Sequence, residues 1–354
     1  MNALHKAQEL LDGRWRTGRL AMQGYTEDAV LAHGWHSRLI AVTGDGDGRQ
    51  YAVKQVRCVP ARTREEQLAL AYAVQEARLL VVALKHPNIV RAHDFFVQDG
   101  AHCLVLELCA GGDLQGRIDA AVPSCSRRAV ELMPATTFSW IVGIANAAAY
   151  FHLQGVIHRD LKPANILLAS QTGTAQDVRV CDFGSARILH RHRGQDHVTT
   201  KPTGTTHYMA PEVTRQEAYD TSADIWSIGA IFLHLLTLRR PNPTALFRGD
   251  PLPVLPLLEH AGADECLYAM LQVAPQRRPS PAVIVERLTR GTACSMCTHG
   301  DAGAHVEEGF SNIDVQLSRR YNDGSMGTTE GRAGRGDEMD EQASSGPPCA
   351  CRVQ

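Results

Sequence analysis

The sequence has 354 residues, of which 44% are hydrophobic and 21% are charged, a composition that supports a substantial buried core. The formal net charge of -2 gives no global positive field, so we expect no nucleic-acid partner. No apolar run approaches the ~18 residues of a spanning helix, no uninterrupted apolar segment marks a secretory signal, and the ten cysteines are scattered. These features predict a cytoplasmic protein with free thiols.

The first third of the chain is predicted to form short strands and one helix. Residues 38–43 and 50–56 flank the turn sequence GDGDG, which is a strong hairpin signal. Residues 65–84 have helical spacing, and Pro87 stops the helix. Residues 103–108 are typical of a buried strand.

The following region, to about residue 290, is predicted to be mainly helical. Residues 138–155 indicate an amphipathic helix that ends at Gly155. Residues 224–237 are apolar on nearly all sides, which predicts a buried central helix.

The composition changes after residue 290. Residues 291–354 contain ten acidic residues and five arginines, so this segment carries -5 and the preceding chain +3. The segment is rich in Gly, Ser and Thr and has too little apolar surface to offset its ordering entropy. We therefore expect an acidic, disordered tail.

Two short segments contain the residues suited to chemistry, HRDLKPAN at 158–165 and CDFG at 181–184. Phosphoryl transfer needs a base for the acceptor hydroxyl, metal ligands and fixed positive charge. Asp160 is placed to accept the hydroxyl proton, and Lys162 can neutralise charge on the transferred group. Asn165 and Asp182 offer the oxygen ligands that Mg²⁺ prefers.

Together with APE at 210–212, these ordered motifs resemble the eukaryotic protein kinase family over residues from about 25 to 290. The resemblance implies an α+β, bilobal fold with a small β-rich N-lobe and a larger helical C-lobe. It divides the chain into an N-terminal extension (1–24), a kinase domain (25–290) and the tail (291–354). ATP and Mg²⁺ are the implied cofactors, and a protein is the implied acceptor.

The resemblance also assigns a nucleotide site. Lys54, in YAVK, matches the lysine that grips the α- and β-phosphates, and Glu76 is its best-matching partner. Adenine would bond backbone groups around Glu107 and Cys109. The side chains implied to enclose the ring are Leu39, Ala52 and Leu167, with Leu106 as the gatekeeper. Surface charge for the ion pair and plain core packing for the apolar residues are the open alternatives.

The phosphate-binding loop should lie in LAHGWHSRL, which begins at Leu31. Counting back from Lys54 sets Ala32, Gly34 and Ser37 at the positions of the family's three glycines. Glycine there allows backbone N–H groups to approach phosphate closely. Ala and Ser are small, so we expect weaker nucleotide binding rather than none.

The sequence LKPAN resembles serine/threonine kinases rather than tyrosine kinases. The resemblance implies that the Thr205 hydroxyl links Asp160 and Lys162, and that Glu212 and Arg278 form a buried ion pair. Asp224 would hold the catalytic loop, although a helix N-cap is an alternative role.

Activation by phosphorylation is a further implication of the resemblance. Arg159 would receive a phosphate carried by the segment between Asp182 and Glu212, where Thr199, Thr200 and Thr203 are candidate acceptors.

The last four residues, Cys351–Gln354, fit a prenylation box, and a lipidated Cys351 would associate the chain with a membrane. An ordinary terminus is the alternative. Cys294, Cys297 and His299 could also join Cys349 and Cys351 around zinc, although the long gap disfavours this.

We therefore predict a signalling serine/threonine protein kinase that transfers the ATP γ-phosphoryl group, with Asp160 as the base. A pseudokinase scaffold with weak nucleotide binding is the main alternative, and the altered glycine loop is its only support. A small-molecule kinase is disfavoured by the segment GTTHYMAPE, which suits a protein substrate.

Overall fold

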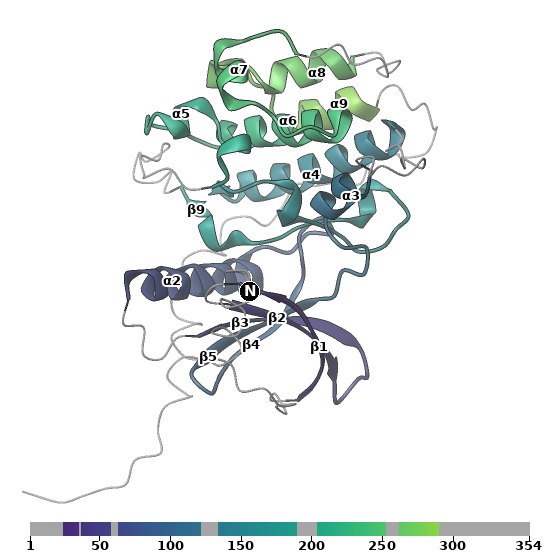
Figure 1. Cartoon of the computed structure of the whole chain (residues 1–354), viewed down its shortest axis with the longest axis vertical. Helices are drawn as coiled ribbons and strands as arrows, with labels where there is room; N and C mark the ends of the chain where they lie inside the picture. Colours follow the sequence, from purple (N-terminus) through teal and green to yellow (C-terminus); the bar gives the residue numbers. More distant parts are fainter. Residues whose placement is uncertain are drawn as a thin grey trace, which may run out of the picture.

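A computed structural model describes residues 24–34, 37–57, 63–121, 134–189, 204–252 and 262–289. It has the predicted α+β, bilobal architecture, with a small β-rich lobe and a larger helical lobe (Figure 1). The small lobe is an antiparallel sheet in the order β1-β2-β3-β5-β4. Its strands are β1 (Tyr25–His33), β2 (Ser37–Gly44), β3 (Gln50–Arg57), β4 (Ala92–Gln98) and β5 (Ala101–Glu107).

The expected hairpin is confirmed, because β2 pairs with β3 in antiparallel register from Ser37–Val56 to Thr43–Gln50. One face of the sheet packs a small apolar cluster around Ile40, Val53 and Val105. Leu104 and Leu106 of β5 instead join the main core. In a strand, successive side chains point to opposite faces, so this alternation directs one set toward the other lobe.

One helix, α2 (Arg64–Arg78), accompanies the sheet and lies between it and the helical lobe (Figure 1). A capping box between Thr63 and Glu66 begins the helix. The expected helix to residue 84 is nearly right in extent, but its last turn, η1 (Leu79–Ala83), is a π-helix closed by a 2.8 Å bond from Leu84 N–H to the Leu79 carbonyl. A π-turn absorbs one extra residue, which changes the direction of the side chains before it relative to those after it.

The large lobe is built around two long helices. Its helices are α3 (Leu114–Ala121), α4 (Pro134–Leu153), α5 (Pro211–Thr214), α6 (Ser222–Thr237), α7 (Pro243–Arg248), α8 (Ala263–Met270) and α9 (Pro281–Thr289). The prediction for α6 is confirmed, since it is buried on nearly all sides. The prediction that 138–155 is amphipathic is wrong, because α4 is covered by α6, α9 and β8 and is buried around most of its circumference.

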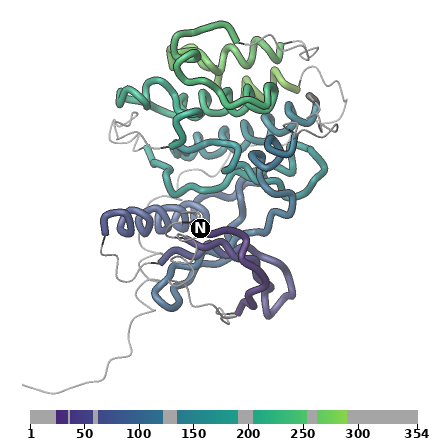
Figure 2. Tube along the Cα trace, viewed as in Figure 1, coloured from purple at the N-terminus to yellow at the C-terminus, as the bar shows by residue number. Residues whose placement is uncertain are grey.

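Two small sheets position the loops that contain the chemistry-bearing segments. β6 (Val156–Ile157) pairs with β9 (Arg187–Ile188), and β7 (Ile166–Leu168) pairs with β8 (Val178–Val180). The loop from β6 to β7 contains residues 158–165, and Asp182 is the second residue after β8. The two chemistry-bearing segments therefore lie side by side, and the Cys181 N–H donates to the Asn165 carbonyl at 3.0 Å. Figure 2 shows the trace of the chain through the two lobes.

The tail, Cys351 and the residues proposed for zinc lie outside the described residues. Within the described ranges, no helix is long and apolar enough to cross a membrane. Cys103, Cys109, Cys181 and Cys266 are free thiols.

Candidate active site

Lys54 joins the two lobes electrostatically. Its Nζ lies 2.7 Å from Glu76 Oε2 and 3.0 Å from Asp182 Oδ1, so three residues far apart in sequence meet at one point. Burial alone would lower the pKa of Lys54, but the charges of Glu76 and Asp182 raise it above its usual range. Burial opposes ionisation of Asp182 as well, but the charge of Lys54 lowers the pKa of that carboxyl. All three groups form one charged network directed toward the space between the lobes.

Glu76 is 2% exposed, and burial raises the pKa of its carboxyl against the attraction of Lys54. A carboxylate in such a place needs its partner, because an unpaired buried charge is strongly unfavourable. The structure thus brings Glu76, rather than a neighbouring residue of the helix, to Lys54.

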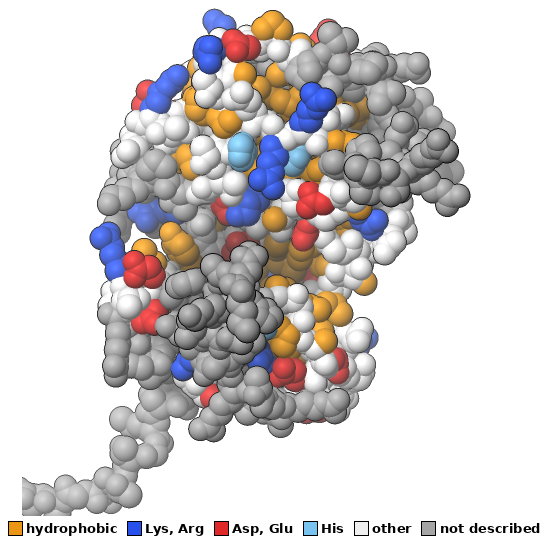
Figure 3. Space-filling view, viewed as in Figure 1, with side chains coloured by type: hydrophobic (Ala, Val, Ile, Leu, Met, Phe, Trp, Pro, Cys, Tyr) orange, Lys and Arg blue, Asp and Glu red, His pale blue; other side chains and the backbone are white. Residues whose placement is uncertain are grey.

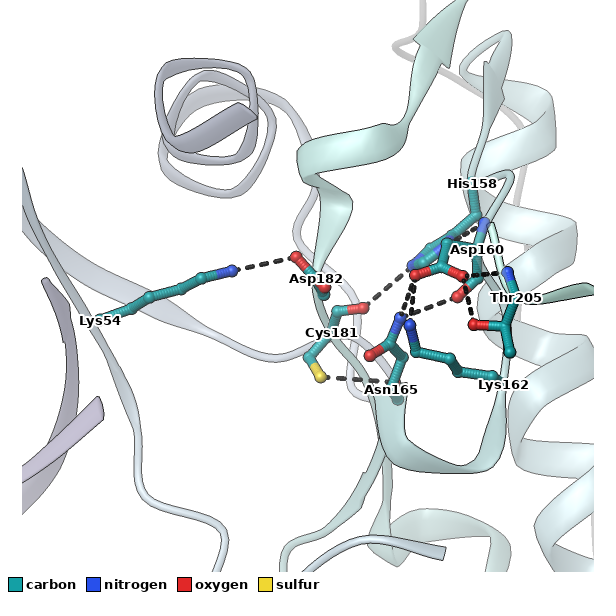
Figure 4. A network of polar contacts seen from close by, with 8 residues as sticks. All are labelled: Lys54, His158, Asp160, Lys162, Asn165, Cys181, Asp182 and Thr205. Carbon is teal, nitrogen blue, oxygen red and sulfur yellow. Dashed lines mark hydrogen bonds and ion pairs between the residues drawn. The ribbon is translucent and has the colours of Figure 1, made fainter. Parts of the chain in front are cut away.

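Asp160 is surrounded by donors (Figure 4). Lys162 Nζ lies 2.6 Å from its Oδ2, which also accepts from Asn165 Nδ2 at 3.2 Å. Its Oδ1 accepts from the Thr205 backbone N–H at 3.1 Å and from the Thr205 hydroxyl at 3.3 Å. The carboxylate is therefore fixed in orientation on both oxygens.

One predicted contact differs. Thr205 was expected to link Asp160 with Lys162, but among the described residues its hydroxyl bonds Asp160 alone. Lys162 donates to the other carboxylate oxygen, so Lys162 and Thr205 each bind a different oxygen of the base.

Asp224 holds the backbone of the loop that contains Asp160. Its Oδ2 accepts from His158 N–H at 2.9 Å and lies 2.9 Å from His152 Nε2, while its Oδ1 accepts from Arg159 N–H at 3.0 Å. The helix N-cap alternative is wrong, because the cap of α6 is Thr221 and Asp224 makes no capping bond. Although burial would raise it, the pKa of Asp224 is lowered mainly by its bond to His152.

Three residues that hold the Asp160 loop in place were given no role in the sequence analysis. His152 supports Asp224, and His158 Nε2 lies 3.0 Å from the Cys181 carbonyl, which ties the two motifs together. Gly204, at φ +120°, passes so close that a Cβ would lie 2.6 Å from the Arg159 carbonyl. The motif HRD itself could have indicated His158; nothing local indicates His152 or Gly204.

Arg159, the predicted phosphate receiver, donates from Nε to the Ser185 carbonyl at 2.5 Å, and its Nη1 lies 3.4 Å from the Tyr219 hydroxyl. The candidate acceptors Thr199, Thr200 and Thr203 lie outside the described residues, so activation by phosphorylation stays a prediction.

The predicted adenine contacts gather where β2, β3 and β5 meet the large lobe. Ala52 is directly opposite Leu106, and Leu39 is opposite Lys54. Leu167 bridges to Asp113 on the far side. The Glu107 carboxylate is occupied by Arg179 at 3.1 Å and by the Arg91 N–H at 2.8 Å, which leaves recognition at this residue to its backbone.

The Cys109 side chain adds no charge to this region. Burial, reinforced by the nearby Glu107 charge, raises the pKa of its thiol to about 12. The thiol is therefore protonated at neutral pH, and Cys109 could contribute to nucleotide binding through its backbone and its apolar contact.

The loop between β1 and β2 is a tight turn. Gly34 N–H bonds the Ser37 carbonyl at 2.8 Å, and a Cβ on Gly34 would lie 2.6 Å from Ser37 Oγ. Ala32 is opposite Leu39, whereas Leu31 is the unpaired residue of a β-bulge and is 47% exposed. Bulges redirect side chains locally, so Leu31 lies beside the turn without packing into the sheet.

Asp182 and Asn165 are the residues predicted to bind Mg²⁺, and both present side-chain oxygen atoms. The Asn165 Nδ2 is committed to the Asp160 carbonyl at 2.8 Å, which leaves its amide oxygen as an acceptor. Among the described residues no group of three or more His, Cys, Asp and Glu could hold a metal. A carboxylate and an amide oxygen still fit Mg²⁺, which keeps several waters and substrate oxygens in its shell.

Below the site, Glu212 and Arg278 form a bidentate pair, with Nη1–Oε1 at 2.6 Å and Nη2–Oε2 at 2.8 Å. Both side chains are almost completely buried, and the guanidinium also lies over the Trp226 ring. Because Arg278 also donates to the Ser222 and Gln272 carbonyls, this pair fixes α5 against the start of α6 and the segment between α8 and α9.

The sequence matches the family described as "Protein kinase domain" over residues 25–250, and the chain belongs to this family. It is 28% identical to mouse serine/threonine-protein kinase Nek3 over 274 residues, covering 75% of this chain and 49% of that protein. It is 30% identical to mouse serine/threonine-protein kinase Nek4 over 267 residues, covering 73% of this chain and 31% of that protein. A shorter stretch of 163 residues is 37% identical to human ribosomal protein S6 kinase alpha-6, covering 46% of this chain and 20% of that protein. The chain thus spans about half or less of each relative.

Proposed function

We propose that this protein is a serine/threonine protein kinase that transfers the γ-phosphoryl group of ATP to hydroxyls of a protein substrate. The observation that carries the proposal is the Asp160 carboxylate, which is oriented by Lys162, Asn165 and Thr205 beside the Lys54–Glu76–Asp182 network. A binding scaffold has no physical need for both arrangements. The family membership and the named relatives support the same assignment.

In this mechanism Asp160 accepts the proton of the acceptor hydroxyl. Lys162, 2.6 Å from that carboxylate, supplies positive charge where negative charge develops on the transferred group. Lys54 holds the α- and β-phosphates and is itself held by Glu76. Asp182 and Asn165 would hold Mg²⁺, which would offset the negative charge of the phosphates. The chain's contribution is mainly positioning and electrostatic stabilisation.

One experiment tests which amino acid accepts the phosphoryl group. Labelled γ-phosphate is transferred from ATP with Mg²⁺ to a generic basic protein, which is then hydrolysed in acid so that the phosphoamino acids can be separated. We expect phosphoserine or phosphothreonine. Phosphotyrosine alone would contradict the substrate class, and label found only on small molecules would contradict a protein acceptor.

We predict that restoring glycines to the β1–β2 turn strengthens nucleotide binding. The variant Ala32→Gly/Ser37→Gly should lower the KM for ATP about 2- to 10-fold with little change in kcat, because backbone N–H groups could approach the phosphates more closely. Steady-state kinetics at varied ATP check this. Gly46→Ala, in the open turn between β2 and β3, is the control and should leave this KM unchanged. A restored loop with an unaltered KM would contradict the alignment.

We also predict that Gly204→Ala lowers kcat about 10- to 100-fold, because the new Cβ would displace the backbone on which Asp160 is positioned. Gly249 provides a matched control: it also has positive φ, but a Cβ there would contact nothing within 4 Å. Both variants place an alanine at positive φ, +120° at Gly204 and +72° at Gly249, so the control carries part of the backbone strain without the close approach. Equal kcat losses in the two variants would show that the close approach does not matter.

The cytoplasmic location and the lipidation of Cys351 remain predictions. A lipidated chain would partition into vesicles, and Cys351→Ser would then remove that binding.

A further inference from the structure

Arg239 and Arg240 follow the last turn of α6 and are exposed. The Arg239 backbone N–H donates to the Thr237 hydroxyl at 3.2 Å, which fixes the turn while both guanidinium groups extend into solvent. Neither guanidinium has a hydrogen bond or an ion pair within the described part of the chain. Figure 3 shows that Lys, Arg and His side chains occur on the large-lobe side of the hollow between the lobes.

The turn that carries Arg239 and Arg240 contacts the segment that orients Asp160. The His207 ring Nδ1 lies 3.0 Å from the carbonyl of Pro241, the residue after Arg240. His207 is two residues beyond Thr205, which donates to Asp160. The Ser227 hydroxyl holds the Tyr208 carbonyl at 2.8 Å, so η6 (Thr206–Tyr208) is fastened to α6. Arg239 and Arg240 therefore flank the surface that a protein substrate must cover to reach the base.

The groups beneath this surface carry no negative charge. The Tyr208 hydroxyl lies 2.7 Å from His234 Nδ1, and both are buried. Burial lowers the pKa of His234 to about 4 and raises the pKa of Tyr208 to about 12, so the pair is neutral at neutral pH. The charge of Arg240 lowers the pKa of both groups and outweighs the opposite effect of Asp119.

The rim also carries two carboxylates, both at α3. Ala164 is the exposed residue of the catalytic loop and has no charge. On α3, Asp113 Oδ1 accepts the Gly116 N–H at 2.8 Å, and Asp119 Oδ1 accepts from Gln115 Nε2 at 2.8 Å. Both carboxylates keep their charge, but at Tyr208 and His234 the effect of Arg240 is larger than that of Asp119.

We propose that Arg239 and Arg240 form a recognition subsite for an anionic side chain that lies close to the acceptor Ser or Thr of the protein substrate. A carboxylate and a phosphoryl group both suit the planar guanidinium fork. Basic side chains near the acceptor are disfavoured by like charge. The inference rests on the proposed kinase function and names the substrate class for that same site.

The test compares peptides with one acceptor serine and flanking residues that are neutral, glutamate, phosphoserine or arginine. For the wild type we expect kcat/KM on the glutamate peptide to exceed that on the neutral peptide about 3- to 10-fold, and the arginine peptide to be poorest. The phosphoserine arm distinguishes the sources: a further increase indicates a phosphorylated substrate, and none indicates a carboxylate.

Arg239→Ala/Arg240→Ala should bring the ratio of glutamate to neutral peptide close to 1, and Arg239→Glu/Arg240→Glu should favour the arginine peptide. Arg287→Ala, an exposed arginine of α9, is the matched control and should leave the ratio unchanged. A wild-type ratio of 1 or less, or a ratio that survives the double variant, overturns the subsite while the kinase assignment stands. Transfer to no peptide and to no generic protein overturns both.

Discussion

Asp160→Asn is expected to lower kcat about 10²- to 10⁴-fold, the usual contribution of a positioned general base. Asparagine has nearly the same shape as aspartate, so the contacts from Thr205 and Lys162 to this position are disturbed in charge more than in geometry. The amide has no site that can accept the hydroxyl proton at neutral pH. The measurement is steady-state transfer of labelled phosphate at saturating ATP and Mg²⁺.

Nucleotide binding should survive in the same variant, because the Lys54–Glu76–Asp182 network is left intact. A fluorescent ATP analogue should bind Asp160→Asn with an affinity within about threefold of wild type. Asp264→Asn, at an exposed position on α8, is the control for loss of a carboxylate and should keep full activity. Equal activity of Asp160→Asn and wild type would remove the base from the mechanism.

Arg278→Ala is expected to lower the free energy of unfolding by about 3–5 kcal/mol, the range for breaking a buried ion pair. The substitution leaves Glu212 buried without its bidentate partner and removes the donors to the Gln272 and Ser222 carbonyls. Urea denaturation followed by tryptophan fluorescence measures this, since Trp226 lies under the guanidinium.

Two further variants show whether the cost comes from the unpaired charge. Arg287→Ala removes an exposed arginine and should change the free energy of unfolding by about 0.5 kcal/mol or less. Glu212→Leu/Arg278→Met removes both charges and should recover much of the loss, because an apolar replacement leaves no buried carboxylate unpaired. A double variant as unstable as Arg278→Ala would mean that the lost backbone contacts dominate.

The bilobal fold was predicted from the ordered motifs that resemble the protein kinase family, whereas single elements followed from local signals. The hairpin of β2 and β3 follows from two strand-like runs around a glycine-rich turn, and the buried α6 follows from an apolar run that no surface helix would carry. The π-turn at Leu79–Ala83 that follows α2 could not be predicted from helical spacing, since its Leu79 and Leu80 are buried in a core formed by distant segments. The same reason explains the error at α4, whose polar side chains such as His152 find buried partners from distant segments.

Within the candidate site, spacing inside one loop was informative by itself, whereas contacts between distant segments were predicted only through the family resemblance. Asp160, Lys162 and Asn165 lie within six consecutive residues, so any fold of that loop keeps them together. Asp224 offered two roles, and which of them it takes depends on where α6 begins relative to a loop more than 60 residues away. Gly204 could not be recognised, because its close approach to the Arg159 carbonyl exists only in the folded chain.

The central claim is that this chain catalyses phosphoryl transfer rather than serving as a scaffold. Its most direct test is mass spectrometry of a protein substrate after incubation with Mg²⁺, millimolar ATP and either wild type or Asp160→Asn. We predict phosphorylated serine or threonine with the wild type and almost none with the variant. An inert wild type that still binds ATP would contradict the account and favour the scaffold, with the glycine-poor turn at Gly34 as the first place to seek the cause.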